Sequence, residues 1–244
     1  MYVEMIDDLK LGMNDDWLLG NTFLVFDLET TGVDVSSDIP VSYALLTMDR
    51  DTCISEAYSI IDPKIEIPDD AARIHGISTA RARECGIPLE DALKVILDSL
   101  LRASNNGWYV VGMNVSFDLS MIDARSRAVY GTGLKELGFS APILDTLVLD
   151  RHFDPYRSGR RTLEALSNHY KVEKGNLHNA LEDCKVTYSV LKAIVRKFPE
   201  IVSFAPERVT GVQAQFHQSW VENYNVWASS HQKAPIAVHE WPIY

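Results

Sequence analysis

The sequence predicts an α/β fold: a mixed central sheet, made of a three-strand antiparallel meander plus parallel strands, flanked by helices and followed by a C-terminal helical extension. Two observations carry this prediction. Strand-like apolar runs come first, at residues 23–26, 41–48 and 54–61. Helical patterns then alternate with short apolar segments, as in parallel strand–helix units. The chain of 244 residues has the length of one good-sized domain with an appendage.

The first predicted strand ends in a pair of acids. Residues 23–26 (FLVF) are apolar on both faces, which is typical of a buried strand. Side chains alternate along a strand, so Asp27 and Glu29 are expected on the same side. Two like charges there repel each other and lose hydration, which a divalent cation would offset. From this stretch alone, a strand that simply ends in two solvated acids is an equally good interpretation.

The other elements follow from local patterns. The polar turn at residues 49–51 joins the second and third strands as a hairpin. Ser116 has the character of a helix N-cap. The remaining predictions are a buried strand at 108–112, a short apolar segment at 143–149, helices at 88–101, 116–129, 162–170 and 179–198, and a last helical pattern from residue 206.

Composition limits the classes of function. The net charge of −11 argues against broad, tight nucleic-acid binding over the whole surface, but allows a metal-dependent enzyme that grips a few nucleotides. The scattered Cys53, Cys85 and Cys184 show no zinc-like spacing and favour a reduced intracellular protein. The acidic start does not resemble a signal peptide, and no segment is long and apolar enough to span a bilayer. We therefore expect a cytoplasmic protein without membrane association.

Two more acids stand where apolar residues are expected. Asp118 shares a helical stripe with Met121, and Asp183 shares one with Thr187 and Val190. A lone acid in such a position is more often at the rim of a core or paired with an arginine. Four inward-facing acids from three segments instead favour a site of oxygen ligands, which suits Mg²⁺ or Mn²⁺.

His178 is a candidate proton acceptor. It precedes Asp183 by five residues, and at about 100° per residue the two would not share a helix face. We expect His178 on a loop before the helix, where a histidine can accept a proton near neutral pH. Taken alone, an ordinary loop histidine would be the better interpretation.

Three motifs in order resemble the DEDD exonucleases, in the subgroup with a histidine in the third motif (the DnaQ-like proofreading family). They are DLETTG at residues 27–32, NVSFD at 114–118 and HNALED at 178–183. The segments IPDDAARIHGIS and ILDT also resemble family segments, and the resemblance covers about residues 23–198. The subgroup with a tyrosine in the third motif is disfavoured because residue 179 is Asn. One departure is the Ser42-Tyr43 pair, where the family usually has Ile-Gly.

The resemblance implies a ribonuclease H-like fold and hydrolysis of nucleic acid from the 3′ end, releasing nucleoside 5′-monophosphates. It also implies two Mg²⁺ or Mn²⁺ ions, about 4 Å apart in such sites. By the family's pattern Asp27, Glu29 and Asp183 would hold the ions. Asp118 would support one ion, and His178 would deprotonate the attacking water.

The resemblance further implies contacts to the 3′-terminal nucleotide. The candidate residues are Leu28, Thr30, Thr31, Gly32, His75, Asn114 and Phe117. Backbone N–H groups at residues 30–32 would meet the nucleotide, Phe117 would stack on a base and His75 would contact the 3′ end. The ordinary alternatives are turn residues, a core aromatic residue and a surface loop histidine.

Two segments outside the motifs have unusual composition. The segment RHFDPYRSGRR, residues 151–161, is rich in arginine although the chain as a whole is acidic. It is either a loop that binds phosphate or a solvated turn before a helix. Phe216, Trp220, Tyr224 and Trp227 form one aromatic face of the last predicted helix. We expect this face to dock on its own domain. A docking surface for a polymerase, another subunit or a second copy is the alternative.

The predicted organisation has three parts: an N-terminal extension (residues 1–20), an exonuclease domain (21–200) and a C-terminal aromatic-rich helical tail (201–244). The predicted function is a metal-dependent 3′→5′ exonuclease that acts on single-stranded DNA ends in replication or repair. The alternatives are a small-RNA or tRNA-trimming exoribonuclease and a non-catalytic polymerase-binding module.

Overall fold

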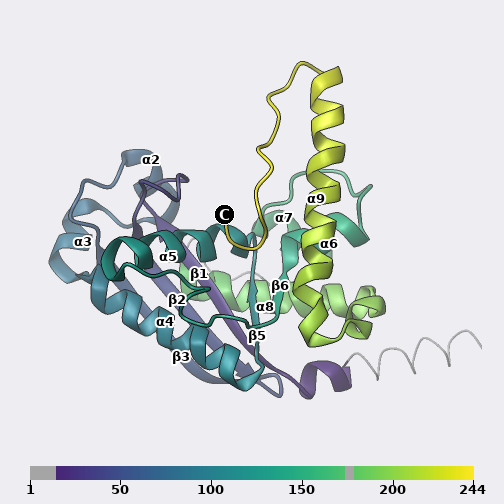
Figure 1. Ribbon diagram of the computed structural model, residues 1–244, viewed down its shortest axis with the longest axis horizontal. Coiled ribbons are helices and arrows are strands. Elements are labelled where there is room, and N and C mark those ends of the chain that lie inside the picture. Colours follow the sequence, from purple (N-terminus) through teal and green to yellow (C-terminus); the bar gives the residue numbers. More distant parts are fainter. Residues whose placement is uncertain (1–14, 174–178) are drawn as a thin grey trace, which may run out of the picture.

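The computed structural model describes residues 15–173 and 179–244, and its described part is built around a six-stranded mixed sheet (Figure 1). The strands are β1 (Thr22–Thr30), β2 (Pro40–Asp49), β3 (Thr52–Asp62), β4 (Ile87–Pro88), β5 (Tyr109–Gly112) and β6 (Ile143–Asp145). Their order across the sheet is β4-β3-β2-β1-β5-β6. β1, β2 and β3 pair antiparallel, whereas β5 pairs parallel with β1 and with β6. The predicted meander plus parallel strands is confirmed.

Helices cover both faces of the sheet. α4 (Leu89–Asn106) and α5 (Val115–Tyr130) pack on one face, and α8 (Ala180–Lys197) packs on the other. The other helices that lie wholly within the described residues are α2 (Asp69–His75), α3 (Thr79–Cys85), α6 (Thr146–Phe153), α7 (Leu163–Tyr170), η1 (Pro199–Ser203) and α9 (Pro206–Ser230). Figure 1 shows α9 standing beside β6 and projecting beyond the sheet. Within the described ranges, no helix combines the length and the apolarity needed to cross a bilayer.

β1 lies inside the sheet, and its side chains alternate between two hydrophobic cores. Phe23 and Val25 pack in the core that includes α8. Leu24 and Phe26 pack in the core that includes α4 and α5. All four side chains are at most 2% exposed, so this part of β1 is fully buried. The next odd-numbered residue, Asp27, therefore faces the α8 side.

α5 begins earlier than the sequence pattern suggests. Asn114 occupies the N-cap position and Val115 is the first helical residue, so the prediction of Ser116 as N-cap is wrong. Asn114 has φ 62° and ψ 37°, a left-handed conformation that asparagine tolerates better than most residues. The turn lies between the end of β5 at Gly112 and the start of α5 at Val115. The N–H of Asn114 donates to the Asp145 carboxylate at 3.0 Å, which holds the turn in place.

α9 closes the edge of the sheet at β6. The fully buried side chain of Gln213 accepts the N–H of Asp145 at 2.9 Å and donates to the carbonyl of Ile143. The hydroxyl of Thr210 accepts the N–H of Ile143 at 3.0 Å. Side chains of α9 thus take the place of a neighbouring strand and satisfy the backbone groups of this edge.

After α9 the chain returns along the same helix and ends against α5 (Figure 1). The side chain of Asn225 forms two hydrogen bonds with the backbone of Ile236, at 2.8 and 2.9 Å. Trp241 packs against the core of α4 and α5, and the N–H of Tyr244 donates to the hydroxyl of Ser120 at 3.0 Å. The segment after α9 is therefore attached both to α9 and to α5.

Candidate active site

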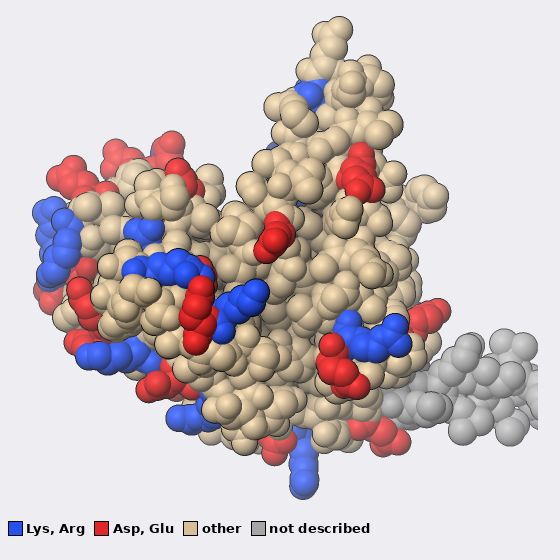
Figure 2. Space-filling model, viewed as in Figure 1, with Lys and Arg blue, Asp and Glu red and all other residues tan. Residues whose placement is uncertain are grey.

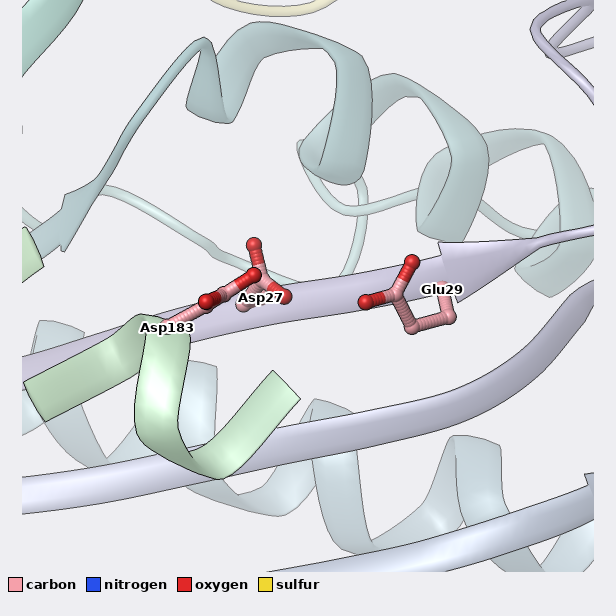
Figure 3. A group of neighbouring side chains, drawn as sticks. All are labelled: Asp27, Glu29 and Asp183. Carbon is pink, nitrogen blue, oxygen red and sulfur yellow. The ribbon is translucent and has the colours of Figure 1, made fainter. Parts of the chain in front are cut away.

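Three carboxylates meet near the C-terminal end of β1. Asp27 and Glu29 lie on β1, and Asp183 lies in the first turn of α8, the helix that packs on this face. One carboxylate oxygen from each of the three lies within 4.8 Å of the other two. Figure 3 shows the three side chains gathered in the space between the strand and the helix. We call these three residues the acid cluster.

Burial and mutual repulsion disfavour negative charge in the acid cluster. Burial raises the pKa of Asp27 well above its usual range, and the charge of the nearby Asp118 raises it further. Burial, together with the charge of Asp183, raises the pKa of Glu29 to about 7. A bound cation would relieve this cost by supplying the opposite charge. Because all the groups are hard oxygen ligands, the cluster fits Mg²⁺ or Mn²⁺.

Asp118 approaches Asp27 from the opposite helical layer. It lies in the first turn of α5, is 5% exposed, and accepts a hydrogen bond from the backbone N–H of Leu28 at 3.0 Å. β5 pairs with β1 only as far as Val25, which leaves this N–H for Asp118. Burial raises the pKa of Asp118, and the bond from Leu28 lowers it in part. The side chain of Leu28 is itself buried, and its predicted contact to substrate stays a prediction.

Asp145 is a buried acid to which the sequence motifs assign no role. One of its carboxylate oxygens accepts the N–H of Asn114 at 3.0 Å and that of Leu147 at 2.9 Å. It therefore caps α6 and also holds the turn before α5, the helix that carries Asp118. Its sequence signal is an acid that follows buried apolar residues of a strand, which is the pattern that singles out Asp27.

The Thr-Thr-Gly turn after β1 is held by its own hydrogen bonds. The N–H of Thr31 donates to the carbonyl of Ile39 at 2.9 Å, and its hydroxyl donates to Asp38 at 2.7 Å. The hydroxyl of Thr30 donates to the carbonyl of Gly32 at 2.6 Å. A Cβ atom at Gly32 would collide with the Asp38 carboxylate, so a larger residue there would displace the side chain that accepts the Thr31 hydroxyl. Contacts of these three residues to a nucleotide stay predictions.

The other predicted substrate contacts differ in exposure. His75 ends α2 and is only 8% exposed, so it is not a surface loop histidine. Its Nδ1 accepts the N–H of Ile77 at 3.1 Å. Burial lowers the pKa of His75, and the backbone of Thr30 offsets part of that effect. Asn114 is exposed and Phe117 is half-buried. Their contacts to substrate also stay predictions.

His178 lies outside the described residues, so its role as proton acceptor stays a prediction from the sequence. The next residue, Asn179, is described and caps α8. Its side-chain oxygen accepts the N–H of Leu181 at 3.1 Å. This cap fixes the start of α8 and so helps to place Asp183 in the first turn.

The arginine-rich loop between α6 and α7 folds around a buried carboxylate. Asp150 is 0% exposed and forms ion pairs with Arg157, at 3.0 Å, and with Arg161. These two arginines fasten the loop to α6. Arg160, by contrast, is exposed and lines a cavity of about 390 Å³ together with Asp183 of the acid cluster.

Comparison with known families identifies the reaction class. A family model described as an exonuclease (RNase_T) matches residues 24–191, which include all three motifs. The chain belongs to this exonuclease family. It is a DnaQ-like exonuclease domain, and hydrolysis of nucleic acid is the reaction of its family. The recognition from the three sequence motifs is confirmed.

The relatives include DNA polymerases III of the PolC type and a subunit of a DNA polymerase III. The epsilon subunit of DNA polymerase III from Aquifex aeolicus is 27% identical over 189 residues, which are 77% of this chain and 87% of that subunit. The PolC-type DNA polymerase III of Caldanaerobacter subterraneus subsp. tengcongensis is 26% identical over 203 residues. The matched region covers 81% of this chain but only 13% of that polymerase, so the chain corresponds to a small part of the PolC-type relatives.

Solved structures of Exonuclease I share the fold. The E. coli enzyme in complex with a dT13 oligonucleotide matches with a TM-score of 0.63 at 19% identity, over 75% of this chain and 43% of that chain. The enzyme of Methylocaldum szegediense matches with a TM-score of 0.62 at 22% identity, over 75% of this chain and 42% of that chain. The fold is therefore ribonuclease H-like, as the motifs predict.

Proposed function

We propose that this exonuclease domain hydrolyses single-stranded DNA from its 3′ end, releases nucleoside 5′-monophosphates and requires divalent cations. The observation that carries the proposal is the convergence of Asp27, Glu29 and Asp183 from two elements onto one space. Such a cluster is electrostatically costly without a cation, and Mg²⁺ or Mn²⁺ is the cation that its ligands suit.

Each residue of the site has a proposed role in this reaction. Asp27, Glu29 and Asp183 would hold two divalent ions, and Asp118 would support one of them. When bound, these ions supply positive charge that stabilises the attacking and leaving oxygens of an in-line displacement. His178 would accept the proton of the attacking water. The turn after β1 and Phe117 would orient the terminal nucleotide.

The choice of DNA as substrate rests on the relatives. The curated relatives include DNA polymerases III of the PolC type and an epsilon subunit, and the E. coli Exonuclease I structure contains dT13. We propose the same substrate class and a role in replication or repair. Association with a polymerase is part of this proposal, since the relatives are polymerases or polymerase subunits.

The proposed catalytic unit is residues 21–200, with extensions at residues 1–20 and 201–244. The contribution of α9 to this unit is structural, because Thr210 and Gln213 satisfy the backbone of β6. The chemistry is assigned to the acid cluster and its neighbours.

Hydrolysis of 5′-labelled single-stranded DNA and RNA oligonucleotides of one sequence, with Mg²⁺ or Mn²⁺, tests the proposal. We expect a ladder of products that shorten from the 3′ end of the DNA. Asp27→Asn and Asp183→Asn should abolish the ladder. Asp98→Asn, which changes an exposed acid of α4, should leave it intact and serves as the matched control. An active Asp27→Asn variant would overturn the proposal, and a ladder from RNA alone would reassign the substrate.

A further inference from the structure

We infer that the aromatic face of α9 and the loop between α6 and α7 form an extended binding surface for single-stranded nucleic acid. We call this surface the α9 track; it comprises Arg151, Tyr156, Arg160, Trp220, Tyr224 and Trp227. The inference rests on the proposed function, because it states where the strand would lie beyond the nucleotide that is cleaved.

The α9 track borders a cavity of unusual composition. The cavity has a volume of about 890 Å³ and lies between the loop and α9. Its lining includes three arginines and five aromatic residues, and no Asp or Glu from the described residues. A cavity lined by Lys171, Arg196 and Lys197 is also basic and free of acids among the described residues, but its lining has one Tyr where the cavity beside α9 has five aromatic residues. This combination is complementary to a polyanion that carries flat rings.

One wall of the cavity is a ladder of aromatic rings on α9. The ring centroids of Trp220 and Tyr224 lie 5.7 Å apart, and those of Tyr224 and Trp227 lie 5.6 Å apart. Trp227 is 45% exposed, and Tyr156 on the opposite wall is 98% exposed. Proteins that bind single strands without sequence preference stack successive bases on aromatic side chains of this kind. Tyr156 is available for such stacking, and Trp227, whose ring also stacks on His231 with centroids 4.6 Å apart, keeps nearly half of its surface exposed.

The arginines of the α9 track have positive charge that their protein partners do not fully balance. The guanidinium of Arg151 lies 3.4 Å from the ring centroid of Trp220. Its buried Nε has no hydrogen-bond partner among the described residues. Burial, reinforced by the charge of Arg161, lowers the pKa of Arg151 to about 10 despite nearby acids. Arg157 and Arg161, which also line the cavity, share the single carboxylate of Asp150, and Asp145 attracts Arg151, so the three arginines outnumber these two acids. Phosphate groups would supply the missing negative charge.

The α9 track begins at the acid cluster. Arg160 lines the cavity of about 390 Å³ that also contains Asp183. The residues on either side of it, Gly159 and Arg161, line the larger cavity beside α9. The loop residues 159–161 therefore lie along the boundary between the two cavities. A strand whose 3′ end lies at the acid cluster can pass over Arg160 and reach the aromatic ladder.

A protein partner is the competing occupant of an exposed aromatic face. In the view of Figure 2, charged side chains are sparse on the projecting part formed by α9 and the returning segment. Low charge alone would suit a protein as well as a nucleic acid. The arginines and the missing acids of the cavity favour the polyanion.

Fluorescence anisotropy with labelled oligothymidylates of about four and about sixteen nucleotides, a range typical of single-strand sites, tests the α9 track. EDTA in the buffer prevents hydrolysis during the titration. We expect the parent protein to bind the longer strand more tightly. Tyr156→Ala and Trp227→Ala should each weaken binding of the longer strand by about 5- to 100-fold. Arg160→Ala should reduce the slope of log affinity against log salt by about one.

Two variants serve as matched controls. Val226 is 74% exposed, adjacent to Trp227 on α9, and outside the cavity lining. Arg102 is an exposed arginine of α4. Val226→Ala and Arg102→Ala should both bind the longer strand as the parent does. If Tyr156→Ala and Trp227→Ala also bind like the parent, the α9 track is overturned.

Hydrolysis assays and sedimentation separate the remaining outcomes. With Mn²⁺, the parent should cleave the longer strand more efficiently than the shorter one, and the track variants should lose this advantage. If the parent cleaves neither strand, the proposed function itself fails. If it cleaves both equally well, only the track fails. If Trp227→Ala converts an oligomer to a monomer without weakening oligonucleotide binding, the face is a protein interface and the inference is wrong.

Discussion

The backbone N–H of Leu28 donates a hydrogen bond of 3.0 Å to the carboxylate of Asp118. The bond joins α5 to β1 at the residue between Asp27 and Glu29. It uses a backbone group that β5 leaves unpaired, because the pairing of β5 with β1 ends at Val25. β1 therefore carries Asp27 and Glu29 and also positions Asp118 through a backbone N–H. This arrangement makes the geometry of the site depend on where β5 ends.

The structural and chemical roles of Asp118 can be separated by two substitutions. Asp118→Asn keeps an oxygen that accepts the N–H of Leu28 but removes the charge, whereas Asp118→Ala removes both. We expect both variants to lose most of the exonuclease activity. The Ala variant should have a free energy of unfolding about 1–3 kcal/mol lower than the Asn variant, because the buried N–H is left unpaired. Urea denaturation in EDTA measures the difference, and equal stability of the two variants would contradict the role of the hydrogen bond.

The acid cluster should destabilise the metal-free protein above neutral pH. Folding raises the pKa of Glu29 from 4.5 to about 7, so the native state binds this proton more tightly than the unfolded chain does. Native stability therefore falls as pH rises through this window. At about pH 8 in EDTA, Glu29→Gln should be more stable than the parent by on the order of 1–3 kcal/mol. The difference should shrink as the pH falls toward the lower end of the window.

Urea denaturation over this pH range, with and without Mn²⁺, checks the prediction about Glu29. Mn²⁺ should stabilise the parent more than Glu29→Gln, because the variant lacks one charged ligand. Glu66→Gln, at an exposed acid in the loop before α2, is the control and should follow the parent at every pH. If the parent is more stable than Glu29→Gln at high pH without metal, the acid cluster carries no electrostatic cost.

Gln213 should contribute more to stability than any exposed polar residue of α9. Gln213→Ala leaves the N–H of Asp145 and the carbonyl of Ile143 without their partners at a buried edge. We expect the free energy of unfolding to fall by about 2–4 kcal/mol. Gln218→Ala changes an exposed glutamine of the same helix and should have an effect within about 0.5 kcal/mol. Similar urea midpoints for the two variants would mean that α9 does not complete the sheet.

Local periodicity predicts much of this fold. The alternation along β1 places Asp27 and Glu29 on the face that α8 covers, and the helical stripe of α8 places Asp183 on that same face. Turn chemistry predicts the β2–β3 hairpin, and the helical patterns give α7 and α8 to within one residue at each end, whereas α4 runs five residues beyond its predicted end at residue 101. The apolar face of β1 must be covered by a helix, and α8 covers it with the face that carries Asp183. The three acids therefore meet as a consequence of these local patterns.

Features that depend on distant parts of the chain are not predictable in this way. Asn114 starts α5 because Asp145, 31 residues later, holds its N–H. From the sequence alone, Gln213 is one more polar residue of an amphipathic helix. Its partner in β6 lies 68 residues earlier in the chain, so no local pattern indicates the hydrogen bond. Asp150 lies on an apolar helix segment, and its burial is explained by the arginines of the following loop and by the hydroxyl of Tyr170, which donates to it at 2.8 Å. In each case a tertiary hydrogen bond or ion pair overrides the local preference.

His178, which lies outside the described residues, should control the rate of the chemical step without controlling metal binding. General-base assistance is typically worth about 10²- to 10⁴-fold, so His178→Ala should lower the single-turnover rate on a short oligonucleotide by that range. Calorimetric titration should show little change in Mn²⁺ affinity, because the carboxylates of Asp27, Glu29 and Asp183 remain.

The pH dependence of the rate distinguishes His178 from the acids. A histidine accepts a proton only when it is neutral, so the parent rate should fall as the pH drops through the titration of a histidine. Saturating Mn²⁺ keeps Glu29 ionised, which removes its own contribution to the acid limb. His178→Ala should lack the limb, whereas His169→Ala, at an exposed histidine of α7, should retain it. An unchanged rate in His178→Ala, or an acid limb that survives this substitution, would remove His178 from the mechanism and leave the proton to another acceptor.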